Sequence, residues 1–372
     1  MGSKIFVAVI LIFVSSLGQD LRQQCGIGPS AFLHKDKDQP FGARRRTSTR
    51  TKIRSAIACW LVLFATFATT GCKPKTAESE DAPQKESHST PLPPRREKLW
   101  LDFDGNRVLT EARTLTRFGP RQSGSEANAQ TQKHLADALV GLGWEPLAQA
   151  FTDNAPDGRR IQFSNIVARY SHFPKATKRF IVAAHFDTLA TNQFSAIGAS
   201  DGAANTAILI ELARVLALDP QVAGQVELLF LDGSAPFRQT TISDGLFGSR
   251  FYTQMASINQ HANDIRAAII LQNVGTDGTR LTFSQNSDPI LAAQMENAAK
   301  LLGYKLEPSN RPFLADHVPF QQAGVPAMAF LDADSQLLNS ADDTSERLNP
   351  TALAKLGSLI SCFLATQSTN YN

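Results

Sequence analysis

The chain has 372 residues, of which 42% are hydrophobic and 19% charged, a composition typical of a globular protein with one large domain and tails. Its formal charge of +3 comes from the front: residues 1–71 contain ten Lys and Arg against three Asp and Glu, which leaves 27 basic and 31 acidic side chains for the remainder. A mildly acidic body excludes a basic nucleic-acid-binding surface as the organising feature, so no nucleic-acid partner is expected.

Residues 41–72 have the pattern of an export signal. Six basic side chains between Arg44 and Arg54 precede residues 55–70, which are uncharged and too few for a comfortable membrane span. The ending Gly71-Cys72 resembles a bacterial lipobox, in which the cysteine is acylated and becomes the mature N-terminus, although Thr69 replaces the usual aliphatic residue. We expect an exported protein of the bacterial cell envelope, anchored to the membrane by lipid at Cys72. An ordinary signal peptide or an uncleaved anchor is the alternative.

Two further segments flank this signal. Residues 5–17 form another apolar run behind Lys4, and two stacked signals are unusual, so residues 1–40 are interpreted as an N-terminal extension, with a mis-assigned gene start as the alternative. Residues 73–97 are polar and rich in Pro, Glu and Lys without periodicity, which is typical of a disordered tether. We expect one folded domain over residues 98–372.

Amphipathic helices and apolar strands alternate from residue 98 onward. We expect helices at residues 105–118, 125–142, 203–218, 248–258, 289–302 and 350–366, and strands at residues 144–151, 160–170, 179–185, 225–231, 265–274, 304–308 and 327–331. Residues 180–184, 226–230 and 267–271 are almost continuously apolar, as in strands that helices cover on both faces. The sequence therefore predicts a three-layer α/β/α domain with a mixed, mainly parallel central sheet.

The four cysteines give no disulfide framework and no CxxC metal motif. Cys362 is the one that falls inside the expected domain, in the apolar residues 359–364 of the last helix. We therefore expect a buried and chemically inert thiol there.

Polar side chains gather where the apolar strands end. His185 and Asp187 follow the first of these strands, Asp201 stands at the next helix start, Ser234 comes just after the second strand, and Gln272 follows the third. In open α/β sheets, ligands bind in the crevice beyond the carboxyl ends of the strands. We expect the functional site at this edge.

A series of short motifs carries a resemblance to a known family. In chain order they are FGPRQSGS at residues 118–125, HFDT at 185–188, GASDGA at 198–203, FLDG at 230–233, LFGSR at 246–250, DHVPF at 316–320 with GVP at 324–326, and DD at 342–343. In this order they resemble the glutaminyl cyclases over roughly residues 100–368. The resemblance implies a zinc exopeptidase-like fold and the cyclisation of N-terminal glutamine to pyroglutamate with release of ammonia. In that family one zinc ion polarises the side-chain amide and a carboxylate shuttles the proton, whereas the related aminopeptidases use two zinc ions and an activated water.

Carried over residue by residue, the resemblance assigns the metal positions to Asp201 and His185, with Asp187 orienting the imidazole ring. The family reads Asp-Gly-Glu-Glu after the second apolar strand, where the first Glu is the acid/base and the second a zinc ligand. This chain reads Asp-Gly-Ser-Ala, so Ser234 and Ala235 replace both carboxylates.

Other positions of the family site also differ. Gln272 replaces an aspartate, Asn339 a histidine ligand, Leu338 a pocket tryptophan, and Ala329 a histidine of the proton-relay network to which Asp316 belongs in the family. Zinc in proteins takes at least three protein ligands. The family's zinc is therefore expected to be absent or weakly bound.

These substitutions lead to a catalytically impaired, glutaminyl-cyclase-like envelope protein that binds peptide N-termini. Two alternatives stay open, namely an active glutaminyl cyclase or metallo-aminopeptidase with a rearranged metal site, and a structural scaffold. Metal content separates the active enzyme from the other two, and peptide binding separates the impaired member from the scaffold.

Several candidate residues also have purely structural interpretations. His185 could be a strand-end histidine bonded to Asp187, and Asp201 could cap a helix beginning at Gly202. The pair Asp316-His317 is more typical of a structural element than of a catalytic dyad, and Asp342-Asp343 of a turn or cap. A nucleophilic role for Ser234 finds no support, since the G-x-S-x-G context is lacking and no base can be identified from sequence.

Overall fold

The computed structural model describes residues 94–189, 196–241, 243–276, 280–332, 334–338 and 340–369. The predictions for residues 1–40, for the signal with Cys72, for most of the tether and for Asn339 lie outside these residues. None of the helices in the described ranges combines the length and the apolar character that a membrane span requires. Contacts with the domain begin before residue 98, because Arg95 Nε donates to the buried Asp219 carboxylate at 2.7 Å and the Arg96 N–H donates to it at 3.1 Å.

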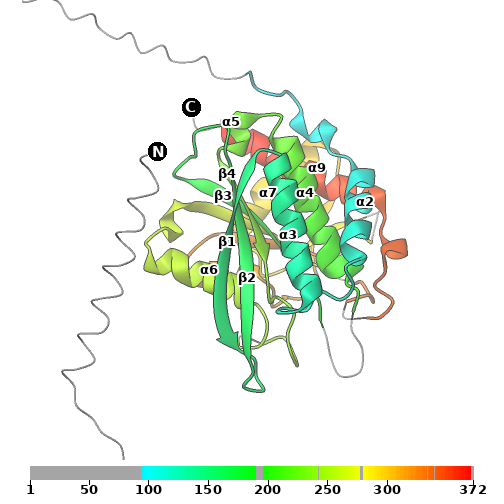
Figure 1. Ribbon diagram of the computed structural model, residues 1–372. Coiled ribbons are helices and arrows are strands. Elements are labelled where there is room, and N and C mark those ends of the chain that lie inside the picture. Colours follow the sequence, from blue (N-terminus) through cyan, green and yellow to red (C-terminus); the bar gives the residue numbers. More distant parts are fainter. Residues whose placement is uncertain are drawn as a thin grey trace, which may run out of the picture. The chain divides into compact units, whose positions relative to one another are not determined.

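Eight strands form one sheet in the order β1-β2-β4-β3-β5-β8-β6-β7. Figure 1 labels β1, β2, β3 and β4 of this sheet and helices around it. The strands are β1 Trp144–Asn154, β2 Arg160–Tyr170, β3 Arg179–His185, β4 Val226–Leu231, β5 Ile265–Leu271, β6 Leu281–Phe283, β7 Leu306–Pro308 and β8 Ala327–Phe330. The helices are α2 Gly105–Thr116, α3 Glu126–Gly141, α4 Asn205–Leu216, α5 Pro220–Ala223, α6 Phe247–Ile258, α7 Pro289–Leu301, α8 His317–Gln322 and α9 Pro350–Thr369. Short helical turns occur at η1 Leu99–Asp102, η2 Ala199–Ala204, η3 Ala262–Asp264 and η4 Ser345–Arg347.

The centre of the sheet is parallel and its flanks are mixed. Strands β4, β3, β5 and β8 run parallel to one another, whereas β1 pairs antiparallel with β2, β2 with β4, and β6 with β8. The outermost pair, β6 and β7, is parallel. The prediction of a mixed, mainly parallel sheet is confirmed.

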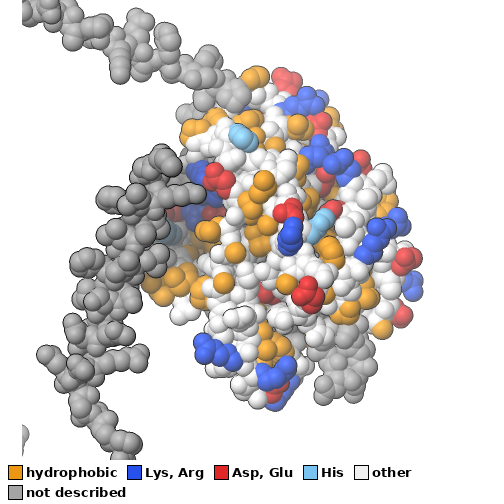
Figure 2. Space-filling view, viewed as in Figure 1, with side chains coloured by type: hydrophobic (Ala, Val, Ile, Leu, Met, Phe, Trp, Pro, Cys, Tyr) orange, Lys and Arg blue, Asp and Glu red, His pale blue; other side chains and the backbone are white. Residues whose placement is uncertain are grey.

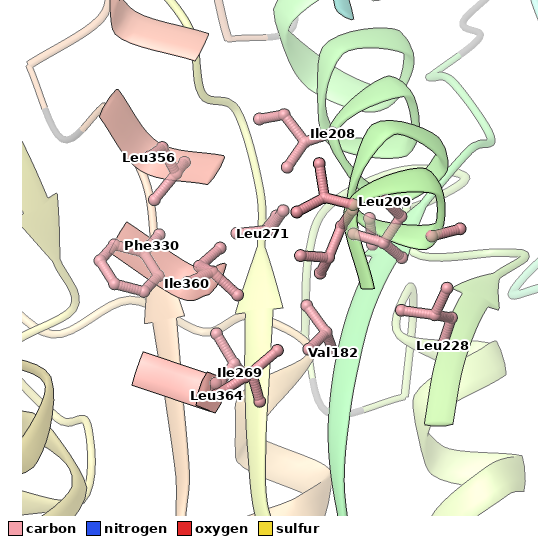
Figure 3. Close-up of a cluster of buried hydrophobic side chains, with 14 of the residues drawn as sticks. Val182, Ile208, Leu209, Leu228, Ile269, Leu271, Phe330, Leu356, Ile360 and Leu364 are labelled. Atoms are coloured by element: carbon pink, nitrogen blue, oxygen red, sulfur yellow. The ribbon is translucent and has the colours of Figure 1, made fainter. Parts of the chain in front are cut away.

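Helices cover the central strands on both faces. Helices α2, α3, α4, α7 and α9 contribute to one core, and α6 and α8 contribute to the other. In β3 the alternate residues Val182 and Ala184 enter the first core and Ile181 and Ala183 the second, all of them fully buried. Figure 3 shows Val182, Ile269 and Leu271 from the strands facing side chains of α4 and α9. The continuous apolar runs therefore mark strands buried on both sides, and the three-layer prediction is confirmed.

Local sequence signals define the ends of the long helices. Ser125 Oγ accepts the Asn128 N–H at 3.1 Å as the N-cap of α3, and Gly143, at φ 82°, lies directly beyond the C-cap residue Leu142. The predicted range 125–142 agrees with these ends. The short elements β6, α5 and α8 were not predicted, because three to six residues are too few to display a period.

The last helix buries its thiol as expected. Cys362 is fully buried in the larger core, and desolvation raises its pKa to about 11. A thiol that stays protonated is a poor nucleophile.

On the face that Figure 2 shows, basic and acidic side chains are interspersed and hydrophobic side chains lie between them in small groups.

Candidate functional site

The parallel strands β3, β4 and β5 end at the same edge of the sheet, and a cavity of about 120 Å³ opens there. Six residues singled out from the sequence line it, and these are His185, Asp201, Ser234, Ala235, Gln272 and Leu338. Parallel pairing of β3, β4 and β5 thus brings together His185 and Gln272 at strand ends and Ser234 in the turn after β4, although these residues are far apart in the sequence. The cavity is the candidate functional site.

His185 is the last residue of β3 and is held from both ring nitrogens. Its Nε2 lies 3.0 Å from Asp201 Oδ1, and its Nδ1 lies 3.2 Å from the backbone oxygen of Asp187 and 3.4 Å from that residue's Oδ1. Burial disfavours the charged ring, but the two carboxylates outweigh burial and raise the pKa of His185 well above its ordinary value. The site therefore contains a buried imidazole ring clamped between two aspartates.

The turn that carries Asp201 is built by glycine and by a distant carboxylate. Gly202 has φ 121°, and a Cβ there would lie 3.0 Å from both Arg121 Nη2 and the Asp187 oxygen, so only glycine fits. Asp343 accepts the N–H groups of Ser200 and Asp201 at 2.7 and 3.1 Å. The interpretation of Asp201 as a helix cap is wrong, because α4 begins at Asn205 and the Asp201 side chain turns to His185 instead.

Arg121 holds the loops around this turn and was missed at the sequence level. Its fully buried guanidinium donates to the backbone oxygens of Phe186, Ile197 and Gly198, each at 2.9 Å. Burial lowers the pKa of Arg121 to about 10, so the group stays charged at neutral pH. The position falls within the motif at residues 118–125, but nothing in that motif signals burial.

Ser234 lies at the turn after β4 and is fixed by two aspartates. The N–H groups of Ser234 and Ala235 donate to the Asp187 carboxylate at 3.1 and 2.9 Å. The Ser234 hydroxyl donates to Asp316 Oδ2 at 2.6 Å, and Ser249 donates to the other Asp316 oxygen at 2.5 Å. The structure thus supplies Ser234 with a carboxylate partner that lies 82 residues away in the sequence.

Asp316 and His317 do not form a dyad with each other. Asp316 is fully buried, and burial raises its pKa above the usual range despite the two hydroxyl donors. His317 is also fully buried, neither of its ring nitrogens has a hydrogen-bond partner among the described residues, and burial lowers its pKa to about 4. Only the aspartate reaches toward the cavity, through Ser234.

The remaining predicted pocket positions divide into two groups. Gln272 follows β5 and lines the cavity, with a buried side-chain oxygen that has no partner among the described residues, and Leu338 lines the cavity while 40% exposed. Ala329 was expected at the pocket and is not there. It lies in β8 and packs in the smaller core, because its side chain points to the face that α6 and α8 cover.

Sequence reasoning missed part of the cavity lining. Asp332, Arg311, Phe313, Leu314 and Leu331 also contribute to it. Asp332 comes two residues after β8, so the rule that polar groups follow parallel strands could have found it. The segment of Arg311 and Phe313 has no such signal, since it lies in the connection between the edge strand β7 and α8 and does not follow one of the central parallel strands.

An open, mainly parallel sheet between two helical layers, with a histidine and an aspartate at its carboxyl edge, is an architecture that this chain shares with zinc-exopeptidase-like α/β proteins. Residues 165–364 match the model of peptidase family M28, which is more than half of the chain. The chain belongs to this family.

The relatives bear out the resemblance to glutaminyl cyclases. A glutaminyl-peptide cyclotransferase-like protein of Bos taurus is 25% identical over 276 residues, covering 66% of this chain and 71% of its own. The glutaminyl-peptide cyclotransferase of Bothrops jararaca is 25% identical over 288 residues, covering 66% and 76%.

Solved structures with the same fold include the glutaminyl cyclase of Fimbriiglobus ruber, with a TM-score of 0.64 and 23% identity over 71% of this chain and 95% of the other. A zinc-dependent exopeptidase of Parabacteroides distasonis has a TM-score of 0.61 and 20% identity over 70% and 97%. At 20–23% sequence identity, the likeness to these structures shows a shared fold alone.

The donor set of this site does not fit zinc. Within the described ranges, no three His, Cys, Asp or Glu side chains converge so that they could hold a metal ion. The two candidate donors, His185 Nε2 and Asp201 Oδ1, are hydrogen-bonded to each other, and Ala235 offers no donor. A zinc site needs at least three such ligands. No catalytic step is therefore assigned to a metal here.

Proposed function

We propose that this family member binds the amino-terminal end of a peptide in the cavity and does not carry out the zinc-dependent cyclisation of glutamine. The observation that carries the proposal is the hydrogen bond between His185 and Asp201. It joins the two surviving metal-type side chains to each other, while Ser234 and Ala235 stand where the family has carboxylates. The family reaction needs a metal ion to polarise the side-chain amide and a carboxylate at position 234 to transfer the proton. This chain offers neither group.

The lining of the cavity supports recognition of a positively charged amine next to an apolar group. The carboxylates of Asp201 and Asp332 line it, and the Asp201 side chain keeps 14% of its surface open beside its bond to His185. Phe313 and Leu338 give an apolar wall and Arg311 a donor. An N-terminal ammonium, a first side chain and a first carbonyl match these three kinds of group.

Isothermal titration with a short peptide tests the binding. A peptide with a free N-terminus should bind at least tenfold more tightly than its acetylated form, since a charge-assisted hydrogen bond contributes about 1.5–3 kcal/mol. Asp201→Asn should weaken binding of the free peptide by a similar factor, and Asp342→Asn, at an exposed carboxylate outside the cavity, should not. Equal affinities for both peptides would contradict N-terminal recognition, and no binding of either would favour the scaffold alternative.

A second assay addresses the reaction itself. Ammonia release from a glutaminyl peptide should stay at background with the wild-type protein, with or without added zinc. Turnover that depends on zinc would favour the alternative of an active enzyme with a rearranged metal site.

The proposal includes export and lipid anchoring at Cys72, and the support for this is the sequence pattern of residues 41–72. Cys72→Ser should move the protein from the membrane fraction to a soluble or unprocessed one. An unchanged membrane fraction would favour an uncleaved anchor.

A further inference from the structure

The contact between Ser234 and Asp316 has the geometry of a nucleophile and its base. Ser234 Oγ donates its proton to Asp316 Oδ2 at 2.6 Å, within the range of a strong hydroxyl-to-carboxylate bond. Ser234 lines the cavity, whereas Asp316 is fully buried and is not among the lining residues. The hydroxyl therefore stands between the carboxylate and any molecule in the cavity.

The surroundings of Asp316 favour proton uptake. Its two oxygens accept from hydroxyl groups, Ser234 on one side and Ser249 on the other, and neither bond comes from an ammonium or a guanidinium. Burial raises the pKa of this carboxyl above its usual range. A carboxylate with a raised pKa is a stronger base toward a bound hydroxyl than an exposed one.

The backbone holds Ser234 in one position. Gly233 has φ 76°, and a Cβ at that position would lie 2.6 Å from the Phe163 ring. The Asp187 carboxylate binds the N–H groups of Ser234 and Ala235. This turn directly follows β4, so the serine is presented at the carboxyl edge by a fixed strand end rather than by a free loop.

We propose that Ser234 and Asp316 form a serine–carboxylate pair that performs acyl transfer on a small ester or amide carbonyl in the cavity. This inference rests on the proposed function only in placing the substrate in the same cavity, and it adds a metal-free chemical step to it. Ser257 serves as the matched comparison, because it is exposed on α6 outside the cavity and its hydroxyl donates to the Thr253 backbone oxygen at 2.9 Å.

The step balances without any added cofactor. Ser234 Oγ attacks the carbonyl carbon and its proton passes to Asp316 Oδ2. The bond from the carbonyl carbon to the leaving oxygen or nitrogen then breaks, and the leaving group takes the proton from Asp316. Water next attacks the acyl-serine ester and gives a proton to Asp316, which returns it to Ser234 as the carboxylic acid leaves.

Donors for the negative charge on the carbonyl oxygen are present in the same cavity. The Arg311 guanidinium and the Asn273 amide both belong to its lining. Guanidinium and amide groups are donor types that stabilise such an oxyanion in acyl-transfer enzymes.

Labelling with a fluorophosphonate probe, followed by peptide mass spectrometry, tests the pair. The wild-type protein should gain one adduct on Ser234, with formation of an oxygen–phosphorus bond and loss of fluoride. Ser234→Ala should abolish this adduct, and Ser257→Ala should react within about threefold of wild type. Asp316→Asn should slow labelling by about 10²–10⁴-fold, the usual contribution of a general base.

The outcomes are separable from those of peptide binding. No adduct on folded wild-type protein, or an adduct on a residue other than Ser234 that forms at the same rate in Ser234→Ala, would overturn the inference while leaving peptide titration unaffected. Should Asp316→Asn fail to fold, a burst of p-nitrophenol from p-nitrophenyl acetate gives a second measure. The burst should occur in wild type and Ser257→Ala and be absent in Ser234→Ala, and equal bursts in all three would overturn the proposal.

Discussion

The adjacent aspartates 342 and 343 allow a sharp test of how the site is held. Asp343 is 1% exposed and accepts the backbone N–H groups of Ser200 and Asp201 at 2.7 and 3.1 Å, whereas its neighbour Asp342 is exposed. Asp343→Ala removes both acceptors from a buried turn. Each buried donor left without a partner costs about 1–3 kcal/mol, so the variant should lose roughly 2–6 kcal/mol of unfolding free energy.

Urea denaturation followed by circular dichroism measures this difference. The midpoint for Asp343→Ala should fall with little change in slope, and Asp342→Ala should stay within about 0.5 kcal/mol of wild type. If the two variants have the same stability, the turn that carries Asp201 is not held by Asp343, and the described organisation of the site is wrong.

Three further predictions concern the Gly202 turn, the buried carboxyl of Asp232 and the family positions 234, 235 and 339. Gly202→Ala should cost about 1–3 kcal/mol of backbone strain at φ 121°, seen as a lower urea midpoint; an unchanged midpoint would contradict the described turn. Burial raises the pKa of Asp232 from 3.8 to about 7, so the folded state keeps a proton that the unfolded chain releases, and stability should fall by up to about 4 kcal/mol as pH rises from about 4 to 7. Asp232→Asn should reduce this loss of stability, measured as the difference between the urea midpoints at pH 4.5 and pH 8. If the variant shows the same difference as wild type, Asp232 is not the group responsible. The triple variant Ser234→Glu, Ala235→Glu, Asn339→His restores the family pattern and should take up about one zinc per chain, whereas a folded triple variant without zinc would contradict the residue matching.

Periodicity was sufficient to predict the long elements of this fold. The bounds expected for β2 and β3 agree with the structure at both ends, because β3 is a nearly continuous apolar run that ends at polar side chains and β2 lies between two turn segments. Strand β6 and helix α8 have only three and six residues, and their existence depends on packing against β8 and α6 rather than on their own sequence.

The candidate site was predictable only where it follows the strand-end rule. His185, Ser234 and Gln272 could be assembled from their places after parallel strands, and Asp332 follows the same rule after β8. The partner of Ser234 could not be predicted, because the bond joins a strand end to a loop 82 residues away.

The most direct test of the account is the zinc content of the full-length wild-type protein. The protein is purified without added metal, dialysed against zinc at the molar concentration of the protein, and then dialysed against zinc-free buffer. The hydrogen bond between His185 and Asp201 and the absence of a donor at Ala235 predict less than about 0.1 zinc per chain by atomic spectrometry. About one zinc per chain would contradict the claim that this family member has lost its metal site, and with it the proposal of a metal-free pocket.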